Sequence, residues 1–217
     1  MKTKLVVLMT LCGMMSAGVA QAGTLTITNA TPVVDSGDIA NFTWDDSSVE
    51  NLWTDFRIGT IDANFGQTFT TKSTGGDFKA VAFRVGNVSG TSSLTRKHSV
   101  RVVAVDGTNT TTLALESNIA VAGPFTTNDW YIFTLETPVT LEGNTIYGVD
   151  IEMTAGADWQ TGVAKLQYNP SDVYAGGNYY YRRDGDPSSF IANTVRDRVF
   201  HLDIDAGPPA GTVIVVK

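Results

Sequence analysis

Apolar side chains recur at every second position along much of this chain, and no other feature constrains its fold so strongly. In the segment Tyr147–Met153, four apolar side chains fall on one face of an extended strand, while Asp150 and Glu152 fall on the other. Other segments share this alternation or are rich in β-branched and aromatic residues, as strands are. The predicted strands are 24–28, 81–85, 99–105, 130–135, 147–153 and 200–204.

Clusters of Gly, Asn and Asp separate these segments. Gly and Asn tolerate positive φ, and Asp bonds its own backbone in tight turns. Short strands with such punctuation predict an all-β fold, an antiparallel β-sandwich that is jelly-roll-like. The only helical expectation is one short turn within 47–56. The predicted turns are Thr74–Asp77, Gly86–Asn87, Asp106–Gly107, Glu142–Asn144 and Asp184–Asp186.

The same alternation predicts which side chains form the core. In a strand with one buried face, the apolar positions of a period-two pattern point inward together. The predicted core includes Phe83, Val85, Val102, Phe133, Tyr147, Val149, Ile151, Phe200, Leu202 and Ile204.

The first 22 residues have the features of a secretory signal peptide. Lys2 and Lys4 precede an apolar run over 5–17, and Ala20–Ala22 offers a small-x-small cleavage site. The run is too short for a stable membrane anchor. We therefore expect a secreted protein, extracellular or periplasmic, with no membrane span after cleavage. The expected organisation is a signal peptide at 1–22, a β-sandwich domain at 23–205 and a Gly/Pro linker with a short tail at 206–217.

Charge and cysteine content limit which partners the protein is expected to bind and how its fold can be stabilised. The net charge is −7 at pH 7, and loss of the two N-terminal lysines makes it more negative, so nucleic acid is not an expected partner. The single cysteine, Cys12, lies in the predicted signal peptide, so the core has to stabilise the fold without disulfides. Sequons, which Thr-rich strands produce by chance, begin at Asn29, Asn41, Asn87 and Asn109.

The sequence lacks the common enzyme motifs, such as a Walker loop, His-Glu-x-x-His and Gly-x-Ser-x-Gly. His98 belongs to the basic cluster 96–98, which we interpret as a solvated strand end. His201 shares a strand face with Asp203 and Asp205, either as a polar outer face or as a group for metal binding or acid–base chemistry.

The segment Val149–Met153 resembles part of the catalytic strand of family 16 glycoside hydrolases. Those jelly-roll enzymes place three carboxylates at alternating positions of one strand, and the outer two act as nucleophile and acid/base. Here the first position is Gly148, so Asp150 and Glu152 cannot supply both roles in that arrangement. We therefore predict no catalytic residues and favour a protein that is not an enzyme.

The segment 168–198 is rich in Tyr and Arg and is the main candidate for a binding surface. Tyr and Trp present flat apolar area to a ligand such as a sugar ring, and Arg offers donors in a fixed fork. The alternative is an aromatic-rich segment packed over the sandwich edge, with at least one of Tyr179–Tyr181 pointing inward. The candidate ligand-binding residues are Trp159, Tyr174, Tyr179, Tyr181, Arg182 and Arg183.

Pairs of acidic residues are candidate ligands for a structural calcium ion, the one cofactor that the sequence leaves as an alternative. Calcium takes six to eight oxygen ligands from carboxylates and carbonyls. The sequence has no EF-hand spacing, and the available pairs are Asp45–Asp46, Asp184 with Asp186, and Asp203 with Asp205.

Several stretches resemble exported bacterial β-sandwich proteins of the kind found among PEP-CTERM-type sorted exoproteins of polysaccharide-degrading bacteria. They are 66–70, 78–85, 131–135, 139–148 and 198–203. The resemblance implies a jelly-roll-like fold and names no ligand. The chain departs from the sorting pattern, because it has no Pro-Glu-Pro tripeptide, no C-terminal apolar span and no closing basic cluster.

Three functions remain open at this point. The first is a secreted, non-catalytic binding module for carbohydrate, with an extracellular polysaccharide or a cell-surface component as partner. The second is a structural or adhesive extracellular sandwich, and the third a jelly-roll hydrolase or lyase. An exposed row of aromatic rings favours the first, and buried aromatics with an exposed apolar edge strand favour the second. A cleft with two carboxylates about 5–9 Å apart favours the third.

Overall fold

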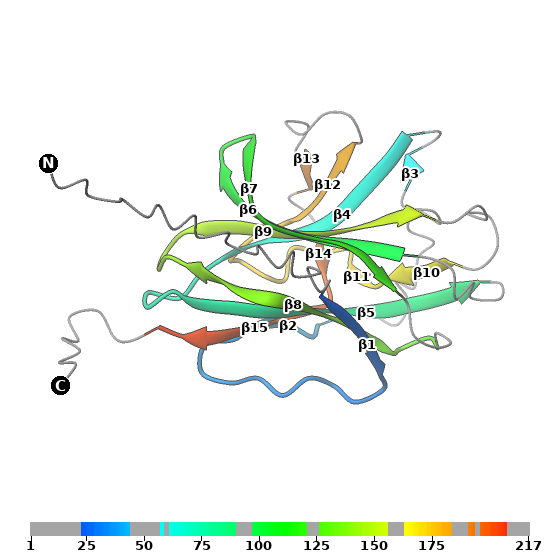
Figure 1. The fold of residues 1–217 in the computed structure, drawn as a ribbon, viewed down its shortest axis with the longest axis horizontal. Coiled ribbons are helices and arrows are strands. Elements are labelled where there is room, and N and C mark those ends of the chain that lie inside the picture. Colours follow the sequence, from blue (N-terminus) through cyan, green and yellow to red (C-terminus); the bar gives the residue numbers. More distant parts are fainter. Residues whose placement is uncertain are drawn as a thin grey trace, which may run out of the picture.

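Two antiparallel sheets lie face to face in the computed structural model, which describes residues 23–43, 57–58, 61–89, 97–120, 126–155, 163–183, 191–193 and 196–207 (Figure 1). The first sheet has the order β1 (Thr24–Thr28), β8 (Trp130–Leu141), β5 (Gly76–Ser89), β15 (Phe200–Ala206) and β2 (Ile39–Asn41), and β10 (Val163–Leu166) also pairs with β5. The second has the order β13 (Ile191–Asn193), β12 (Tyr179–Arg183), β4 (Ile61–Thr70), β9 (Ile146–Ala155), β6 (Lys97–Asp106) and β7 (Asn109–Ala120), and β3 (Arg57–Ile58) also pairs with β4. A small sheet joins β11 (Tyr168–Asn169) to β14 (Asp197–Arg198).

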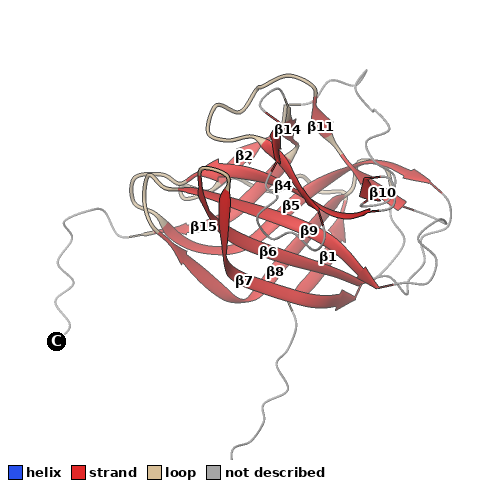
Figure 2. Ribbon diagram, turned by 90° about the horizontal axis from the view of Figure 1, so that it is seen from above, coloured by secondary structure: helices blue, strands red, loops and turns tan. Residues whose placement is uncertain are grey.

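The predicted all-β antiparallel sandwich is confirmed. Figure 2 views the sandwich from above, where the strands of one sheet overlie those of the other. Along the chain, β4 lies in the second sheet, β5 in the first, β6 and β7 in the second, β8 in the first and β9 in the second. This alternation agrees with jelly-roll-like connectivity, which stays a prediction. Within the described ranges, no helix is long and apolar enough to cross a membrane.

The core between the sheets contains every residue predicted for it. Phe83, Phe133 and Phe200 have no exposed surface and come from three neighbouring strands of the first sheet. Val149 and Ile151 on β9 face them from the second sheet and are equally buried. The period-two pattern therefore identified the inward face of each of these strands correctly.

Three of the predicted turns are present, and one prediction is wrong. Gly75 and Gly107 have φ of 60°, and Asn144 has φ of 54°, a region that favours Gly and Asn. In contrast, Gly86–Asn87 is not a turn, because β5 continues to Ser89 and pairs there with β10. Asp184–Asp186 and the helical turn predicted within 47–56 lie outside the described residues.

The outer face of the first sheet carries a small second cluster, and the polar outer face predicted for His201 is covered at that residue. Trp130 and Val199 are 2% and 0% exposed, and Phe42 packs against them. Beside them, His201 is 7% exposed, so it does not lie on a solvated polar face. Its Nε2 lies 2.9 Å from Asp38 Oδ2, and Asp38 Oδ1 accepts the Ile204 amide at 3.0 Å.

His98 is also buried, contrary to its interpretation as part of a solvated strand end. It is 4% exposed, and its ring stands edge-on to Tyr131 and Phe133, with centroid distances of 6.4 and 5.8 Å. Rings from the opposite sheet cover it, which the local sequence around His98 does not reveal.

Asn41 fastens the short strand β2 to the segment before β15. Its Nδ2 donates to the Arg198 carbonyl at 2.8 Å, and its Oδ1 accepts the Thr43 amide at 3.1 Å. The side chain is 6% exposed, so both polar ends of this amide are satisfied inside the fold.

Candidate functional site

The outer face of the second sheet carries a groove that described residues line. Alternation along β4 turns Phe65, Gln67 and Phe69 toward the sandwich interior. Thr68 and Thr70 therefore point outward, and their register partners on β9 are Gly148 and Ile146.

The segment 174–178, just before β12, lies along this face beside β4. Thr68 Oγ1 donates to the Asn178 carbonyl at 3.1 Å and accepts the Asn178 amide at 2.7 Å. Thr70 Oγ1 donates to the Gly176 carbonyl at 2.9 Å. A Cβ at Gly177 would collide with the Thr68 carbonyl oxygen, so this close approach requires glycine.

A hollow of about 320 Å³ lies where this segment, the β6–β7 turn and the start of β9 meet. Its size is at the lower end of the range for small-molecule sites. Ile146, 48% exposed, gives it apolar surface beside the Thr70 hydroxyl. The lining residues of this groove are Thr68, Thr70, Val105, Gly107, Ile146, Ala175, Gly176, Gly177 and Asn178.

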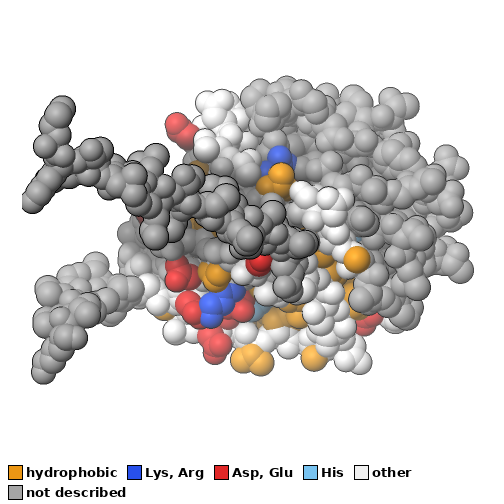
Figure 3. All heavy atoms as spheres, viewed as in Figure 1, with side chains coloured by type: hydrophobic (Ala, Val, Ile, Leu, Met, Phe, Trp, Pro, Cys, Tyr) orange, Lys and Arg blue, Asp and Glu red, His pale blue; other side chains and the backbone are white. Residues whose placement is uncertain are grey.

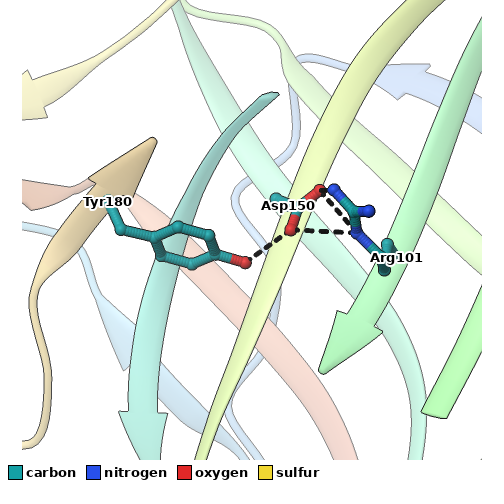
Figure 4. A network of polar contacts seen from close by, with 3 residues as sticks. All are labelled: Arg101, Asp150 and Tyr180. Atoms are coloured by element: carbon teal, nitrogen blue, oxygen red, sulfur yellow. Dashed lines mark hydrogen bonds and ion pairs between the residues drawn. The ribbon is translucent and has the colours of Figure 1, made fainter. Parts of the chain in front are cut away.

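Further along the same face, three polar side chains from β6, β9 and β12 form a network (Figure 4). Arg101 donates from Nη2 to Asp150 Oδ1 at 2.8 Å and from Nε to the same carboxylate at 3.2 Å. Tyr180 donates its hydroxyl to Asp150 Oδ2 at 2.7 Å. Its ring lies over Gly66 and Gly148, where a Cβ on either glycine would come within about 3 Å of the tyrosine.

This network bears on the strand that resembles a glycosidase catalytic strand. Asp150 is 1% exposed, and its carboxylate is engaged by a cation and a hydroxyl at the same time. It is therefore held as a structural group rather than presented to a ligand. The side chain of Glu152 lies outside the described residues.

The three predicted binding residues whose side chains the structure describes, Tyr174, Tyr179 and Tyr181, pack with the core. Tyr179 is 3% exposed and belongs to the core, and Tyr181 is half-buried against the same core. Tyr174 is half-buried too, with its ring edge-on to Phe200 at 5.3 Å, and burial raises the pKa of its hydroxyl to about 12. Trp159 and the side chains of Arg182 and Arg183 lie outside the described residues.

A buried polar cluster behind these tyrosines was not anticipated from the sequence. Asp197 has no exposed surface and accepts hydrogen bonds from Gln67 Nε2 and from the amides of Val173 and Tyr174 at 2.8–2.9 Å. Burial raises the pKa of this carboxyl despite those bonds. The cluster fixes the start of the segment that borders the groove.

Arg198 lies next to this cluster inside the sandwich. It is 3% exposed, and its guanidinium carbon lies 4.4 Å from the ring centroid of Tyr179 and 5.6 Å from that of Phe65. Burial lowers the pKa of this guanidinium. Cation–π contact and a hydrogen bond from Nη1 to the Leu166 carbonyl at 3.2 Å compensate part of its lost hydration. No turn or motif signal in the sequence distinguishes Arg198 from a surface arginine.

The acidic pairs proposed as calcium ligands do not gather in the part of the chain that the structure describes. Among those residues, no three His, Cys, Asp or Glu side chains are placed to hold a metal ion. Asp205 forms an ion pair with Lys79, and Figure 3 shows acidic side chains around a basic one near β15. Asp45, Asp46, Asp184 and Asp186 lie outside the described residues.

Comparison with known proteins returned no relative. No protein-family model, curated protein or solved structure matches the chain.

Proposed function

We propose that this protein is a secreted, non-catalytic binding module that takes carbohydrate in the groove beside Ile146. The observation that carries the proposal is the open hollow on the outer face of the second sheet, with apolar and hydroxyl groups side by side. The export that the proposal assumes follows from the signal-peptide pattern at 1–22.

The chemistry of the groove suits a sugar. Ile146 and Val105 offer apolar surface to the C–H face of a sugar ring, and the Thr70 hydroxyl has a lone pair free while its proton goes to Gly176. Hydrogen bonds hold the segment 176–178 against β4, so the groove wall is pre-organised for binding. The ligand surface is therefore a shallow groove and not a row of stacked tyrosines.

A screen against a glycan array, followed by calorimetric titration of a glycan that binds, tests this proposal. Ile146→Arg places a long charged side chain over the groove, and Gly107→Asn adds a polar side chain at its rim while accepting the positive φ there. We expect each variant to weaken binding at least tenfold without a change in melting temperature. Val33→Arg, at a position that is 79% exposed and does not line the groove, is the matched control.

Two results would oppose the proposal. If no glycan binds to the wild-type protein, the carbohydrate function fails. If both groove variants bind as tightly as the control, a carbohydrate site exists elsewhere, and Trp159 becomes the first residue to replace.

A structural or adhesive function is the second candidate, and a different observation favours it. The described aromatic side chains are buried or half-buried. In addition, β7 is the last strand of the second sheet and exposes Leu113 and Leu115, at 43% and 55%. An exposed apolar edge strand can pair with another chain.

The irregularity of β7 weighs against edge pairing. Val102 pairs with Ala114 and Val103 with Thr112, so Leu113 is an extra residue, and a second register shift occurs near Asn118, where φ is 60°. Bulges of this kind protect edges from pairing. If assembly occurs nonetheless, Leu113→Lys with Leu115→Lys will reduce the mass measured by light scattering at high concentration, and a constant monomer mass in both proteins would exclude it.

A further inference from the structure

Glu116 joins the two sheets at one edge of the sandwich. It lies on β7, in the second sheet, and its two carboxylate oxygens accept hydrogen bonds from the residue before β1 and from β8, on the side of the first sheet. Oε2 accepts the backbone N–H of Gly23 at 3.1 Å, and Oε1 accepts that of Glu136 on β8 at 3.1 Å. Figure 1 shows β7 slanting from its own layer toward β1 and β8.

Gly23, immediately before β1, is fitted closely into this corner. It is buried, and a Cβ there would lie 2.5 Å from the Thr134 carbonyl oxygen and 3.3 Å from Glu116 Cγ. Real Cβ atoms do not approach carbonyl oxygens so closely, so the position requires glycine. The nitrogen of Gly23 is thus held at a fixed place beside a carboxylate.

The sequence predicts cleavage of the chain at this same nitrogen. The site Ala20–Ala22 places the scissile bond between Ala22 and Gly23. Hydrolysis of that amide adds one water, leaves a carboxylate on Ala22 and releases an amine on Gly23. An α-amine has an ordinary pKa of about 7.7–8.0, so it carries a proton and a positive charge at neutral pH.

We propose that the Glu116 carboxylate is a binding site for the α-ammonium group that signal-peptide cleavage creates on Gly23. The proposal rests on the export proposed above and is independent of the ligand groove. In the uncleaved chain, Glu116 accepts one neutral amide N–H from Gly23. After cleavage, the same nitrogen brings a full charge and more donors, and a charge-assisted hydrogen bond is roughly twice as strong as a neutral one.

The proposal implies that the fold becomes more stable when the signal peptide is removed. Gly23 leads directly into β1 of the first sheet and Glu136 lies on β8 of the same sheet, whereas Glu116 belongs to the second sheet, so a stronger bond at Gly23 fastens the two layers together at this edge. Cleavage would therefore stabilise the exported protein relative to its precursor.

A double-mutant cycle tests this proposal. Two forms are compared, one beginning at Gly23 and one beginning at Gln21, each with and without Glu116→Gln. We expect Glu116→Gln to raise the unfolding equilibrium constant about tenfold more in the form that begins at Gly23, which is a coupling of about 1.4 kcal/mol. We also expect the unmodified Gly23 form to melt about 3–6 °C above the Gln21 form.

Glu136→Gln is the matched control, because that carboxylate is exposed on the same edge while only its backbone amide contacts Glu116. It should show no coupling to the position of the N-terminus. Equal effects of Glu116→Gln in both forms would overturn the proposal. If Glu116→Gln does not fold, the melting temperatures of the two unmodified forms are compared instead. Equal melting temperatures would also overturn the proposal.

N-terminal sequencing of the protein secreted from its host tests the export and cleavage separately. A first residue of Gly23 supports the premise. A different first residue shows that cleavage occurs elsewhere, whatever the double-mutant cycle finds for the Gly23 form.

Discussion

At the scale of single residues, this fold places several charged groups inside and gives each one different partners. Asp150 has a cation and a hydroxyl as partners, Asp197 has an amide side chain and two backbone amides, and Arg198 has aromatic rings and a carbonyl. A buried charge that loses one such partner is costly, because water cannot replace it. These residues should therefore be among the most sensitive polar positions in the part of the chain that the structure describes.

Removal of the Tyr180 hydroxyl tests this sensitivity. Tyr180→Phe takes one hydrogen bond from the buried Asp150 carboxylate, so we expect a loss of about 1.5–3 kcal/mol in the free energy of unfolding. Tyr147→Phe is the comparison, because it removes a hydrogen bond between two uncharged groups, in which the Tyr147 hydroxyl accepts the Glu142 amide. This variant should lose about 0.5–1.5 kcal/mol in the free energy of unfolding. Urea denaturation of both variants measures the two losses, and equal losses would contradict the argument.

Asp38 should make stability depend on pH on the acid side. Burial raises the pKa of its carboxyl, but the amides of Asp35 and Ile204 and the contact with His201 outweigh burial and lower it below its ordinary value. The folded protein then binds fewer protons than the unfolded chain as pH falls. This contribution is present above the ordinary pKa of about 3.9 and is lost as pH falls through the lower folded value.

The expected result is a steeper loss of stability below about pH 4 in the wild-type protein than in Asp38→Asn. Denaturant unfolding between pH 7 and pH 3 measures both curves. Parallel curves would show that Asp38 titrates alike in the folded and unfolded chains.

At the scale of elements, the groove on the second sheet depends on the segment 174–178 more than on any strand. The closeness of Gly177 to β4 allows Thr68 and Thr70 to bond the segment, and the segment then forms one wall of the groove. A local change at this glycine should therefore disturb both the sheet edge and the groove.

Gly177→Ala is expected to displace this segment from β4. The added Cβ collides with the Thr68 carbonyl, and a forced shift of this kind costs about 1–3 kcal/mol. Amide hydrogen exchange should become faster at Thr68 and Asn178, whose N–H groups bond across this contact. Ala175→Ser, at an exposed position of the same segment, serves as the comparison and should leave both amides protected.

The sequence predicted β1, β5, β6, β8, β9 and β15 together with the core residues on them, and it missed β4, β7 and what depends on distant segments. β7 was not predicted, because two extra residues interrupt the alternation between 109 and 120. The burial of His98 and His201 was missed, because alternation shows which face a side chain takes but not whether another segment covers that face. The groove was missed for the same reason, since it combines residues from β4, β6, β9 and the segment before β12.

At the scale of the whole molecule, the first sheet joins segments from both ends of the chain. β15 lies between β5 and β2, and β1 pairs with β8, so this sheet is complete only when distant segments meet. Each of these pairings closes a long loop before it gains any contact energy.

Folding should accordingly be slow for a chain of this size. We expect refolding of the protein that begins at Gly23 to take milliseconds to seconds, the range of all-β folds with non-local pairing. Stopped-flow tryptophan fluorescence measures the rate, since Trp130 passes from water to a site that is 2% exposed. Short unfolding pulses separate this phase from proline isomerisation. Refolding within microseconds would contradict the argument.

The bonds of Asn41 have a consequence for how this protein can be made. Asn41 begins a sequon, and a glycan would be attached to the same Nδ2 that donates to the Arg198 carbonyl. A eukaryotic secretory pathway can modify a chain while it is still unfolded, and a sugar at this nitrogen could not be accommodated where the side chain is 6% exposed. Production in a host without N-glycosylation, or as Thr43→Ala, which removes the sequon at an exposed position and keeps both bonds of Asn41, avoids a modification that would keep β2 from its place in the sheet.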